Sequence, residues 1–519
     1  MTVQNVLFIM CDQLRQDHLG CYGHPYLRTP NIDALARRGV RFTQAYVNSG
    51  VCGPSRMSYY TGRYPVSHGA TWNRVPLSVG EVTLGEYLGN AGYDLALAGK
   101  THVMPDIAAM ERLNIDGGSE LGRLLTHGGF RELDRYDGHH EPGQESGYPA
   151  FLRRHGYESK DPWSDYVISA VAPDGQIVSG WHMRNAHLPA RVSEPHSETA
   201  YMTDQAISFV NEKGQQPWVL HLSYVKPHWP YMAPSPYHAM YNADQCLPVV
   251  RNQDELKNAH PVVAAYRQHE ESQSFSLDEC VRTVRPAYQG LISQVDTHLG
   301  RLFDNMGKKG VLDRTLVIFT ADHGDFLGDH WLGEKELFFD CVQRVPLIVV
   351  DPSAKADATR GQTDDRFAEA VDIVPTILDA LAVPGEEHRI EGRSLLDLTR
   401  NRETDWRNAT FSELDYSFRG ARLTLNKPVQ SARAFSMRTE RWRYVLWLDE
   451  PEQLYDLQAD PNEFCDLGRD PGHEAVRAQM RTQLLDWLAR RKHRTTVSDD
   501  FIRSRTNTHK KAGVFYGQW

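Results

Sequence analysis

Cysteine is scarce in this sequence, and its placement argues against two common uses. The 519 residues contain seven cysteines, at positions 11, 21, 52, 246, 280, 341 and 465, an odd number that includes no CxxC pair. A disulfide framework or a zinc-binding cysteine cluster needs paired, closely spaced cysteines. The scattered pattern is instead typical of a reducing compartment, and we therefore expect a cytoplasmic protein.

Long hydrophobic runs and an excess of positive charge are also missing. The first residues, MTVQNVLFIMCDQ, have no basic segment, and their apolar run is too short for a signal peptide or a membrane span. The formal net charge is −10, whereas a general nucleic-acid surface needs clustered Lys and Arg. We expect neither a membrane nor a nucleic-acid partner, and an anionic substrate would need a locally basic pocket.

Four short apolar runs end in polar residues, and this pattern carries the fold prediction. NVLFIM, YDLALAG, WVLHLSYV and TLVIFTA lead into Cys11–Gln13, Lys100–His102, Lys226–His228 and Asp322–His323. These runs are typical of buried strands, and helix-like segments lie between them. The alternation predicts an α/β fold with a mostly parallel central sheet flanked by helices. Ligands of such sheets bind beyond the carboxyl ends of the strands, so the four polar ends form a candidate site.

The alternation of strands and helices is interrupted twice. Residues from about 104 to 200 are rich in Gly, His, Pro and acidic residues, which predicts an insertion that could cap the site within a catalytic domain of residues 1–404. Leu277–Met306 has the apolar spacing of a long amphipathic helix. From residue 405 the pattern predicts antiparallel strands and then a closing helix. Residues 405–519 are therefore expected to form a smaller C-terminal α+β subdomain.

The stretch SGVCGPSRMSYYTGRYP, Ser49 to Pro65, contains the most informative cysteine. Pro54 fits the first turn of a helix, which would place Cys52 at the N-terminus, where free backbone N–H groups favour an anion. Arg56 follows one turn later on the same helix face. Taken alone, this pattern is more typical of a buried structural cysteine beside a surface arginine.

The same stretch resembles the signature of the sulfatase family, CxPxR followed closely by TGR. Cys52, Pro54 and Arg56 match its required positions, and Thr61–Arg63 match the trailing part. Gly53 departs from the pattern, because family members more often carry a slightly larger small residue there. The resemblance implies an alkaline phosphatase-like fold. It also implies that a formylglycine-generating enzyme converts Cys52 to formylglycine, whose hydrated aldehyde is the nucleophile.

One divalent metal ion is the next implication of the resemblance. Sulfatases usually carry paired aspartates after the first strand, where this chain has Asp12 and Gln13. They carry an aspartate followed by asparagine or histidine where this chain has Asp322 and His323. By position these four residues would bind the ion together with an oxygen of modified Cys52. Such ligands suit Mn²⁺ or Ca²⁺, and the lower negative charge that Gln13 and His323 give the site favours Mn²⁺.

Further residues match catalytic and substrate-binding positions of the family. AGKTHV matches a GKxH element, in which Lys100 would contact the anionic substrate and His102 would support the nucleophile. His228 in KPHWPY lies where the family has a histidine that binds the substrate or protonates the leaving group. Lys335 in LGEKELFFD matches a second substrate lysine. Arg56 would help to offset the charge of the transferring group.

A narrower resemblance is to the phosphonate monoester hydrolase branch of the same superfamily. HLSYVKPHWPYMAPSPYHAMY and GLISQVDTHLGRLF are similar to that branch, and Asn73 matches an active-site asparagine there. The branch is cytoplasmic and oligomeric, which implies a homo-oligomer, a dimer or a tetramer. It typically has Tyr and Thr where this chain has Lys100 and His102. The sequence thus resembles that branch over these two segments, but Lys100 and His102 give this chain a pocket of the sulfatase type.

Three hypotheses about function follow from these matches. The first is hydrolysis of sulfate monoesters, aryl sulfates in particular, by formylglycine and one metal ion, with phosphonate monoesters and phosphodiesters as further substrates. The second is a phosphonate monoester hydrolase or phosphodiesterase whose sulfatase activity is secondary. The third is a non-catalytic scaffold that binds a metal or an anion and keeps Cys52 as a thiol. For the first two, the expected partners are a small anionic ester and the modifying enzyme.

Overall fold

A large, mostly parallel sheet forms the centre of the computed structural model, which describes residues 3–138 and 146–517. Its strands follow the order β11-β2-β10-β9-β1-β8-β4-β5. All neighbouring strands pair in parallel except β10, which is antiparallel to both β9 and β2. The bounds are β1 (Asn5–Asp12), β2 (Val40–Phe42), β4 (Leu95–Gly99), β5 (Arg131–Arg135), β8 (Val219–Pro227), β9 (Thr315–Ala321), β10 (Leu347–Val350) and β11 (Thr363–Asp364). The predicted α/β fold is confirmed.

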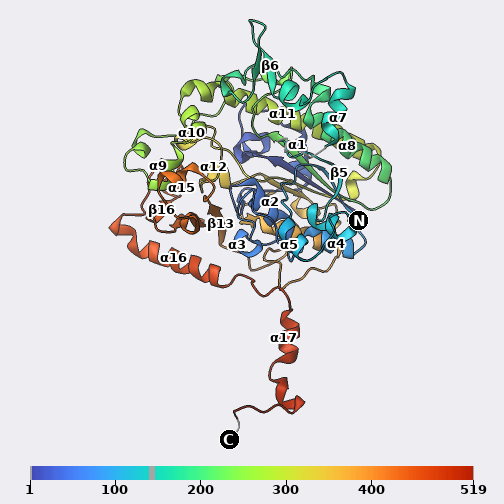
Figure 1. Ribbon diagram of the computed structural model, residues 1–519, viewed down its shortest axis with the longest axis vertical. Coiled ribbons are helices and arrows are strands. Elements are labelled where there is room, and N and C mark those ends of the chain that lie inside the picture. The colour runs from blue at the N-terminus through green and yellow to red at the C-terminus, as the bar shows by residue number, and fades with distance from the viewer. Residues whose placement is uncertain (1–2, 139–145, 518–519) are drawn as a thin grey trace.

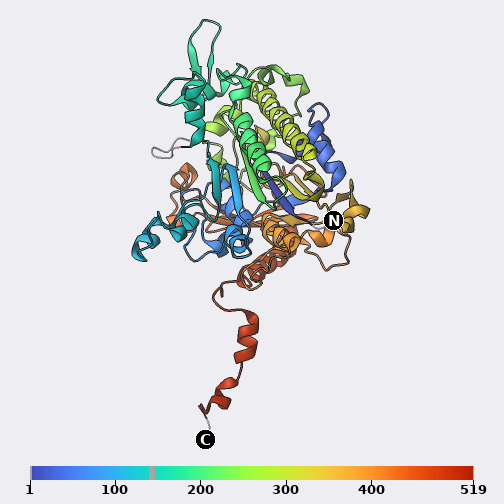
Figure 2. The same cartoon turned by 90° about the vertical axis from the view of Figure 1, so that its right-hand side faces the viewer.

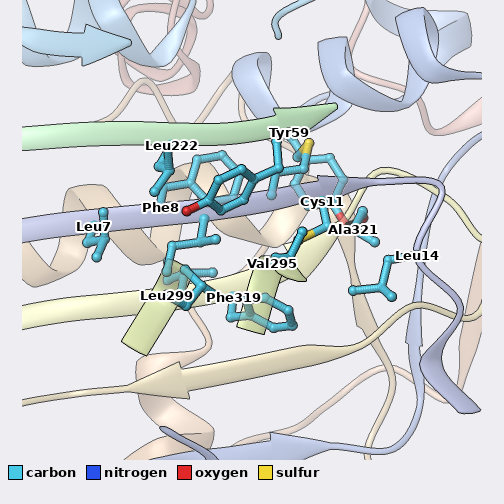
Figure 3. Packing of buried hydrophobic residues seen from close by; sticks show 14 of the residues in the cluster. Leu7, Phe8, Cys11, Leu14, Tyr59, Leu222, Val295, Leu299, Phe319 and Ala321 are labelled. Carbon is cyan, nitrogen blue, oxygen red and sulfur yellow. Dashed lines mark hydrogen bonds between the residues drawn. The ribbon is translucent and has the colours of Figure 1, made fainter. Parts of the chain in front are cut away.

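Helices cover both faces of this sheet (Figure 1). One face carries α1 (Pro30–Arg38), α8 (Glu198–Lys213) and α11 (Asp278–Lys308), and the other carries α2 (Cys52–Thr61), α4 (Leu84–Asn90) and α13 (Ile373–Leu381). In Figure 3, Val295 and Leu299 of α11 lie on one side of β1 and Tyr59 of α2 lies on the other. Burial on both faces explains why β1 is apolar at nearly every position. The long helix predicted from Leu277 is α11 and is confirmed.

The four strands predicted from the apolar runs lie next to one another. β9, β1, β8 and β4 are consecutive in the sheet and parallel. Their carboxyl ends therefore meet at one edge, together with the N-terminus of α2. This arrangement brings the polar residues that follow each strand into a single site.

The segment predicted as an insertion contains one strand of the main sheet. β5 pairs in parallel with β4, and it was missed because its sequence, RELDR, is charged, as an edge strand permits. The rest of the segment contains α5 (Ile107–Arg112), α6 (Glu120–Thr126), α7 (Gly147–Arg154) and the hairpin of β6 (Ser169–Val171) and β7 (Ile177–Ser179). Residues 139–145 of this segment lie outside the described residues. The boundaries at 104, 200 and 404 stay predictions.

A smaller α+β unit follows near the C-terminus, as expected. Its antiparallel sheet has the order β13-β14-β15-β16, and α16 packs against it with Trp487 stacked on Phe411 at a ring-centroid distance of 4.3 Å. The bounds are β13 (Ala409–Asp415), β14 (Arg433–Thr439), β15 (Trp442–Trp447), β16 (Gln453–Asp456) and α16 (Glu474–Ala489). Beyond it, α17 (Asp499–Arg505) extends away from the body (Figure 2). None of the helices in residues 3–138 and 146–517 combines the length and hydrophobicity that a membrane span requires.

Candidate active site

Cys52 begins α2 at the carboxyl edge of the sheet. Val51 before it has an extended backbone, and Pro54 occupies the first helical turn, where a missing N–H costs nothing. The Gly53 N–H donates to Asn73 Oδ1 at 2.7 Å. A Cβ at Gly53 would lie 2.9 Å from both Cα and Oδ1 of Asn73, so the close approach of Asn73 explains the glycine at this motif position.

Arg56 is fully buried, in contrast to the surface arginine that the isolated pattern suggested. Its Nε donates to Asp322 Oδ2 at 2.8 Å and one terminal nitrogen donates to Asp12 Oδ2 at 3.2 Å. The other terminal nitrogen donates to the Lys100 carbonyl and to Ser223 Oγ, both at 2.8 Å. Through these bonds Arg56 connects the carboxyl ends of β1, β4 and β9 with the middle of β8.

Four buried side chains form a group that could hold a metal ion. Asp12, Cys52, Asp322 and His323 each place one ligand atom within 4.8 Å of the others. Cys52 Sγ lies 3.1 Å from His323 Nε2, and that nitrogen lies 3.7 Å from an oxygen of each aspartate. The Gly324 carbonyl contacts His323 Nδ1 at 2.8 Å, which leaves Nε2 facing the group. Two carboxylates and an imidazole fit a hard or borderline divalent ion.

Gln13 lies beside this group, and its amide has a defined direction. Its Nε2 donates to Asp325 Oδ2 at 2.5 Å and to the Tyr231 hydroxyl at 3.3 Å. Its Oε1 accepts from Lys335 Nζ at 3.3 Å, and its backbone N–H donates to Asp322 Oδ1 at 3.0 Å. The role of Gln13 as a metal ligand stays a prediction, while its contacts place the amide oxygen toward the charged centre.

Two lysines face the same centre. Lys100 Nζ lies 2.7 Å from Asp12 Oδ2, and Lys335 Nζ lies 3.0 Å from His228 Nε2. His228 Nδ1 is 2.6 Å from the Trp229 carbonyl, which can only accept, so Nδ1 carries the proton. His228 Nε2 is then the acceptor of the Lys335 bond and the atom that faces the site.

His102 is fixed by its backbone. The N–H groups of Thr101 and His102 both donate to Asp137 Oδ1, at 2.8 and 3.2 Å, and Arg135 binds the other Asp137 oxygen. His102 adopts a φ of 56°, a strained value for a residue other than glycine. Its side chain is one of the groups that lower the pKa of the Cys52 thiol.

The charges around Cys52 change its acidity. Burial by itself would raise the pKa of the thiol, but Lys335, Lys100 and His323 together hold that pKa well below its ordinary value. Burial lowers the pKa of His228, and Lys335 lowers it further. For His323, burial would lower the pKa, but Asp322 and Cys52 raise it to about 9. In the unmodified chain these cations therefore favour the thiolate form of Cys52 over the thiol.

The structure brings all the predicted site residues together, and their chemical roles stay predictions. They are Asp12, Gln13, Cys52, Arg56, Asn73, Lys100, His102, His228, Asp322, His323 and Lys335. Four supporting residues were not predicted, namely Asp137, Ser223, Tyr231 and Asp325. Two of them had a signal in the sequence: Asp325 follows His323 by two positions, and Ser223 is a polar residue inside an apolar strand.

Comparison with known proteins shows which family this chain belongs to. The protein-family profile described as "Sulfatase" matches residues 4–115 and 121–383, and "N-sulphoglucosamine sulphohydrolase, C-terminal" matches residues 328–490. Together with the fold and the Cys52 stretch, these matches define a member of the alkaline phosphatase superfamily, and within it the chain belongs to the sulfatase family.

Individual relatives cover nearly the whole chain. "Multifunctional alkaline phosphatase superfamily protein PehA" of Trinickia caryophylli is 34% identical, over 95% of this chain and 97% of its own length. An arylsulfatase of Clostridium perfringens is 27% identical, over 89% and 90% of the two chains. Among solved structures, the phosphonate monoester hydrolase from Silicibacter pomeroyi superimposes with a TM-score of 0.83 at 29% identity, over 95% of this chain and 96% of its own. That of Agrobacterium radiobacter has a TM-score of 0.81 at 28% identity, over 94% and 95%.

Proposed function

We propose that this chain is an enzyme that hydrolyses sulfate monoesters, aryl sulfates in particular, with phosphonate monoesters and phosphodiesters as further substrates. One observation carries the proposal: the family's cysteine, Cys52, is one of four buried residues that could hold a metal ion, and two buried lysines, Lys100 and Lys335, face the same centre. Lys100 and Lys335 offer a monoanionic ester a basic pocket inside a chain whose net charge is −10.

The proposal includes a bound divalent metal ion and the conversion of Cys52 to formylglycine. Asp12, Gln13, Asp322, His323 and modified Cys52 would hold one divalent ion, Mn²⁺ in preference to Ca²⁺, and a bound ion offsets negative charge on the transferring group. A modifying enzyme would convert Cys52 to formylglycine, whose aldehyde hydrate supplies a nucleophile and a route for its own release.

The residues of the chain then bind the ester and move protons. Lys100 and Lys335 bind the oxygens of the sulfuryl group, and their charge favours its transfer. Arg56 keeps Asp12 and Asp322 in place, because its guanidinium bonds both carboxylates. His228 Nε2, the atom that faces the site, accepts from Lys335 Nζ, so a proton for the leaving oxygen would pass from that lysine through Nε2. His102, beside Cys52, accepts the proton released when the covalent adduct breaks down.

The second candidate is a phosphonate monoester hydrolase, and the fold similarity favours it. A sulfate monoester and a phosphonate monoester each carry one negative charge, whereas a phosphate monoester carries nearly two, so one basic pocket serves both. Asn73, which matches an active-site asparagine of that branch, accepts from the Gly53 N–H at the start of α2, and this contact supports the second candidate.

The specificity constants of two esters with the same aryl group distinguish these candidates. We expect a higher kcat/KM for the aryl sulfate than for the aryl phosphonate monoester. A variant that combines Lys100→Tyr with His102→Thr, the residues typical of the other branch, should shift the ratio toward the phosphonate. A clear phosphonate preference of the unaltered chain would favour the second candidate, and failure to hydrolyse either ester would favour a non-catalytic scaffold.

We also propose a homo-oligomer, a dimer or a tetramer. Residues 499–517, which we call the C-terminal arm, extend from the body in both views (Figures 1 and 2). The arm exposes Phe501, Val514, Phe515 and Tyr516, each by about half or more. A second copy of the chain is the partner that the narrower resemblance suggests for this arm.

A further inference from the structure

Lys335, the second lysine of the proposed site, lies in a strained stretch of backbone. Its neighbours on both sides, Glu334 and Glu336, have φ values of 61° and 95°, which residues other than glycine rarely adopt. Such conformations persist only where surrounding contacts hold them. One of these contacts is the hydrogen bond from the Phe326 N–H to the Glu334 carbonyl, at 2.7 Å. The position of Lys335 therefore depends on what holds its two neighbours.

Glu336 also joins this stretch to the segment that carries Cys52. Its backbone forms an antiparallel β-bridge with Gly50, two residues before Cys52. A Cβ at Gly50 would lie 2.8 Å from the Glu336 carbonyl oxygen, so the close approach of the two backbones explains the glycine at this position. A displacement of Glu336 would therefore affect both Lys335 and the start of α2.

The side chain of Glu336 is buried and pairs with an arginine of the C-terminal α+β unit. Arg419, between β13 and α15 (Gly420–Thr424), places its Nε 3.1 Å from Glu336 Oε2. Among the residues that the structure describes, no other ion pair involves Glu336. Removing one partner of a buried ion pair leaves a charge that is costly to keep away from water. Without Arg419, the strained stretch could lower this cost by moving Glu336 toward water.

Arg419 is itself held in place by further contacts. One of its terminal nitrogens pairs with Glu271 of α10 (Glu270–Phe275). His269, at the start of that helix, accepts the backbone N–H of Ala421 through Nε2 at 3.0 Å, which fixes the first turn of α15 against α10. A guanidinium that is held by a second carboxylate and by a fixed backbone has little freedom to move. Arg419 can therefore determine where the Glu336 carboxylate lies.

We propose that Arg419 is a positioning residue for the reaction: by holding Glu336, it keeps the ammonium group of Lys335 where the sulfuryl oxygens bind. This inference rests on the ester hydrolysis proposed above. Lys335 Nζ lies 3.3 Å from Gln13 Oε1 and 3.0 Å from His228 Nε2, and a shift of about 1 Å in such a group can cost roughly 100-fold in rate. The C-terminal unit thus takes part in catalysis without contacting the substrate.

The hydrolysis kinetics of an aryl sulfate test the inference in a double-mutant cycle. Arg419→Met should lower kcat/KM by about tenfold, and Arg419→Lys, which keeps a positive charge beside Glu336, should lower it less. Lys335→Met removes the group through which Arg419 acts. In the Lys335→Met background, Arg419→Met should therefore lower kcat/KM by less than about twofold. A further tenfold loss in that background would show that Arg419 does not act through Lys335, and would overturn the inference.

Arg400→Met is the matched control. Arg400 Nε lies 2.7 Å from Asp351 Oδ2, and the Asp351 side chain is fully buried. Because Asp351 follows β10, which runs antiparallel to β9, this ion pair lies at the edge of the sheet opposite the proposed site. The control should lower the free energy of unfolding, as Arg419→Met does, but change kcat/KM by less than about twofold. Equal losses of kcat/KM in the two variants would contradict the positioning role while the sulfatase proposal stands.

Binding of inorganic sulfate separates the inference from the proposed function, because it needs no turnover. By isothermal titration calorimetry, we expect Arg419→Met to raise the dissociation constant by about threefold to tenfold, Arg400→Met to leave it unchanged, and Arg419→Met to add nothing in the Lys335→Met background. If aryl sulfates are not hydrolysed yet this pattern is found, the hydrolysis proposal fails and the positioning role stands. Sulfate binding that Arg419→Met leaves unchanged overturns the role. Absence of both binding and hydrolysis in the unaltered chain contradicts both proposals.

Discussion

Cys52 lies buried at the start of α2 among charged side chains, and these charges affect its pKa. Two lysines and His323 lower the pKa of the thiol against the effect of burial. The same cations would favour an anionic substrate once the thiol is replaced by formylglycine. Burial inside a charged centre distinguishes this cysteine from Cys11, whose pKa burial and the carboxylates of Asp322 and Asp12 raise.

The direction of the Gln13 side-chain amide leads to a prediction about the stability of variants at this residue. Gln13→Glu replaces the donor that lies 2.5 Å from Asp325 Oδ2 by a second buried carboxylate. We expect the free energy of unfolding to fall by roughly 2–4 kcal/mol, because two buried like charges then face each other. Adding Asp325→Asn supplies an amide that can donate to the new carboxylate, and it should recover more than half of the loss.

Urea unfolding of the four proteins in this cycle provides the measurement. The coupling energy between positions 13 and 325 should be on the order of 1–3 kcal/mol, with Asp325→Asn alone as the control. Strictly additive effects would show that Asp325 does not orient the amide of Gln13.

Individual strands determine how much of the architecture the sequence could predict. The runs that became β1, β4, β8 and β9 are buried on both faces, so their apolar composition identifies them and the residues at their ends. β5 is a charged edge strand, and its pairing depends on β4, which no local pattern reveals. Asp137 and Ser223 were missed for the same reason, since their partners lie far away in sequence. Family resemblance, not spacing, supplied the roles of Lys100, His228 and Lys335.

The start of α1 depends on a residue of α11. Asp296 accepts from the backbone N–H of Asn31 at 3.1 Å and of Ile32 at 2.8 Å. It thus caps the first turn of α1, where Thr29 at the N-cap makes no side-chain cap. Asp296→Ala should lower the free energy of unfolding by about 1–2 kcal/mol. Asp304→Ala, an exposed position on the same helix, should cost less than about 0.5 kcal/mol, and equal effects in urea unfolding would contradict the capping role.

At the scale of the whole molecule, a bound ion would connect elements that are distant in the chain. The proposed ligands come from β1, α2 and the segment after β9. A ligand that binds only the folded state stabilises it by about 2.7 kcal/mol at 100 times its dissociation constant. After treatment with a chelator, Mn²⁺ should therefore raise the Tm, at lower concentration than Ca²⁺.

The variant Asp322→Asn is the control for this shift. It removes one charged ligand, and the Tm of the folded variant should respond little to Mn²⁺. If no divalent cation changes the Tm of the unaltered chain, the metal site is contradicted.

The C-terminal arm gives a second prediction at this scale. The hydrogen bonds and ion pairs of the described residues 499–517 reach no further back than Arg494. Removal of the arm should therefore leave the stability of a single folded chain unchanged. Size-exclusion chromatography with light scattering should find a dimer or tetramer for the whole chain and a smaller species without the arm. A monomer in both cases would contradict the proposed assembly.

Conversion of Cys52 to formylglycine is the central claim, and the mass of one peptide tests it most directly. Trypsin releases Phe42–Arg56 from the purified, natively produced protein, and this peptide contains Cys52 as its only cysteine. We predict a mass lower than that of the unmodified peptide by the difference between a CH₂SH and a CHO side chain, with an aldehyde that reacts with a hydrazide probe. An unmodified thiol in metal-loaded protein would contradict the proposed mechanism and favour a non-catalytic scaffold.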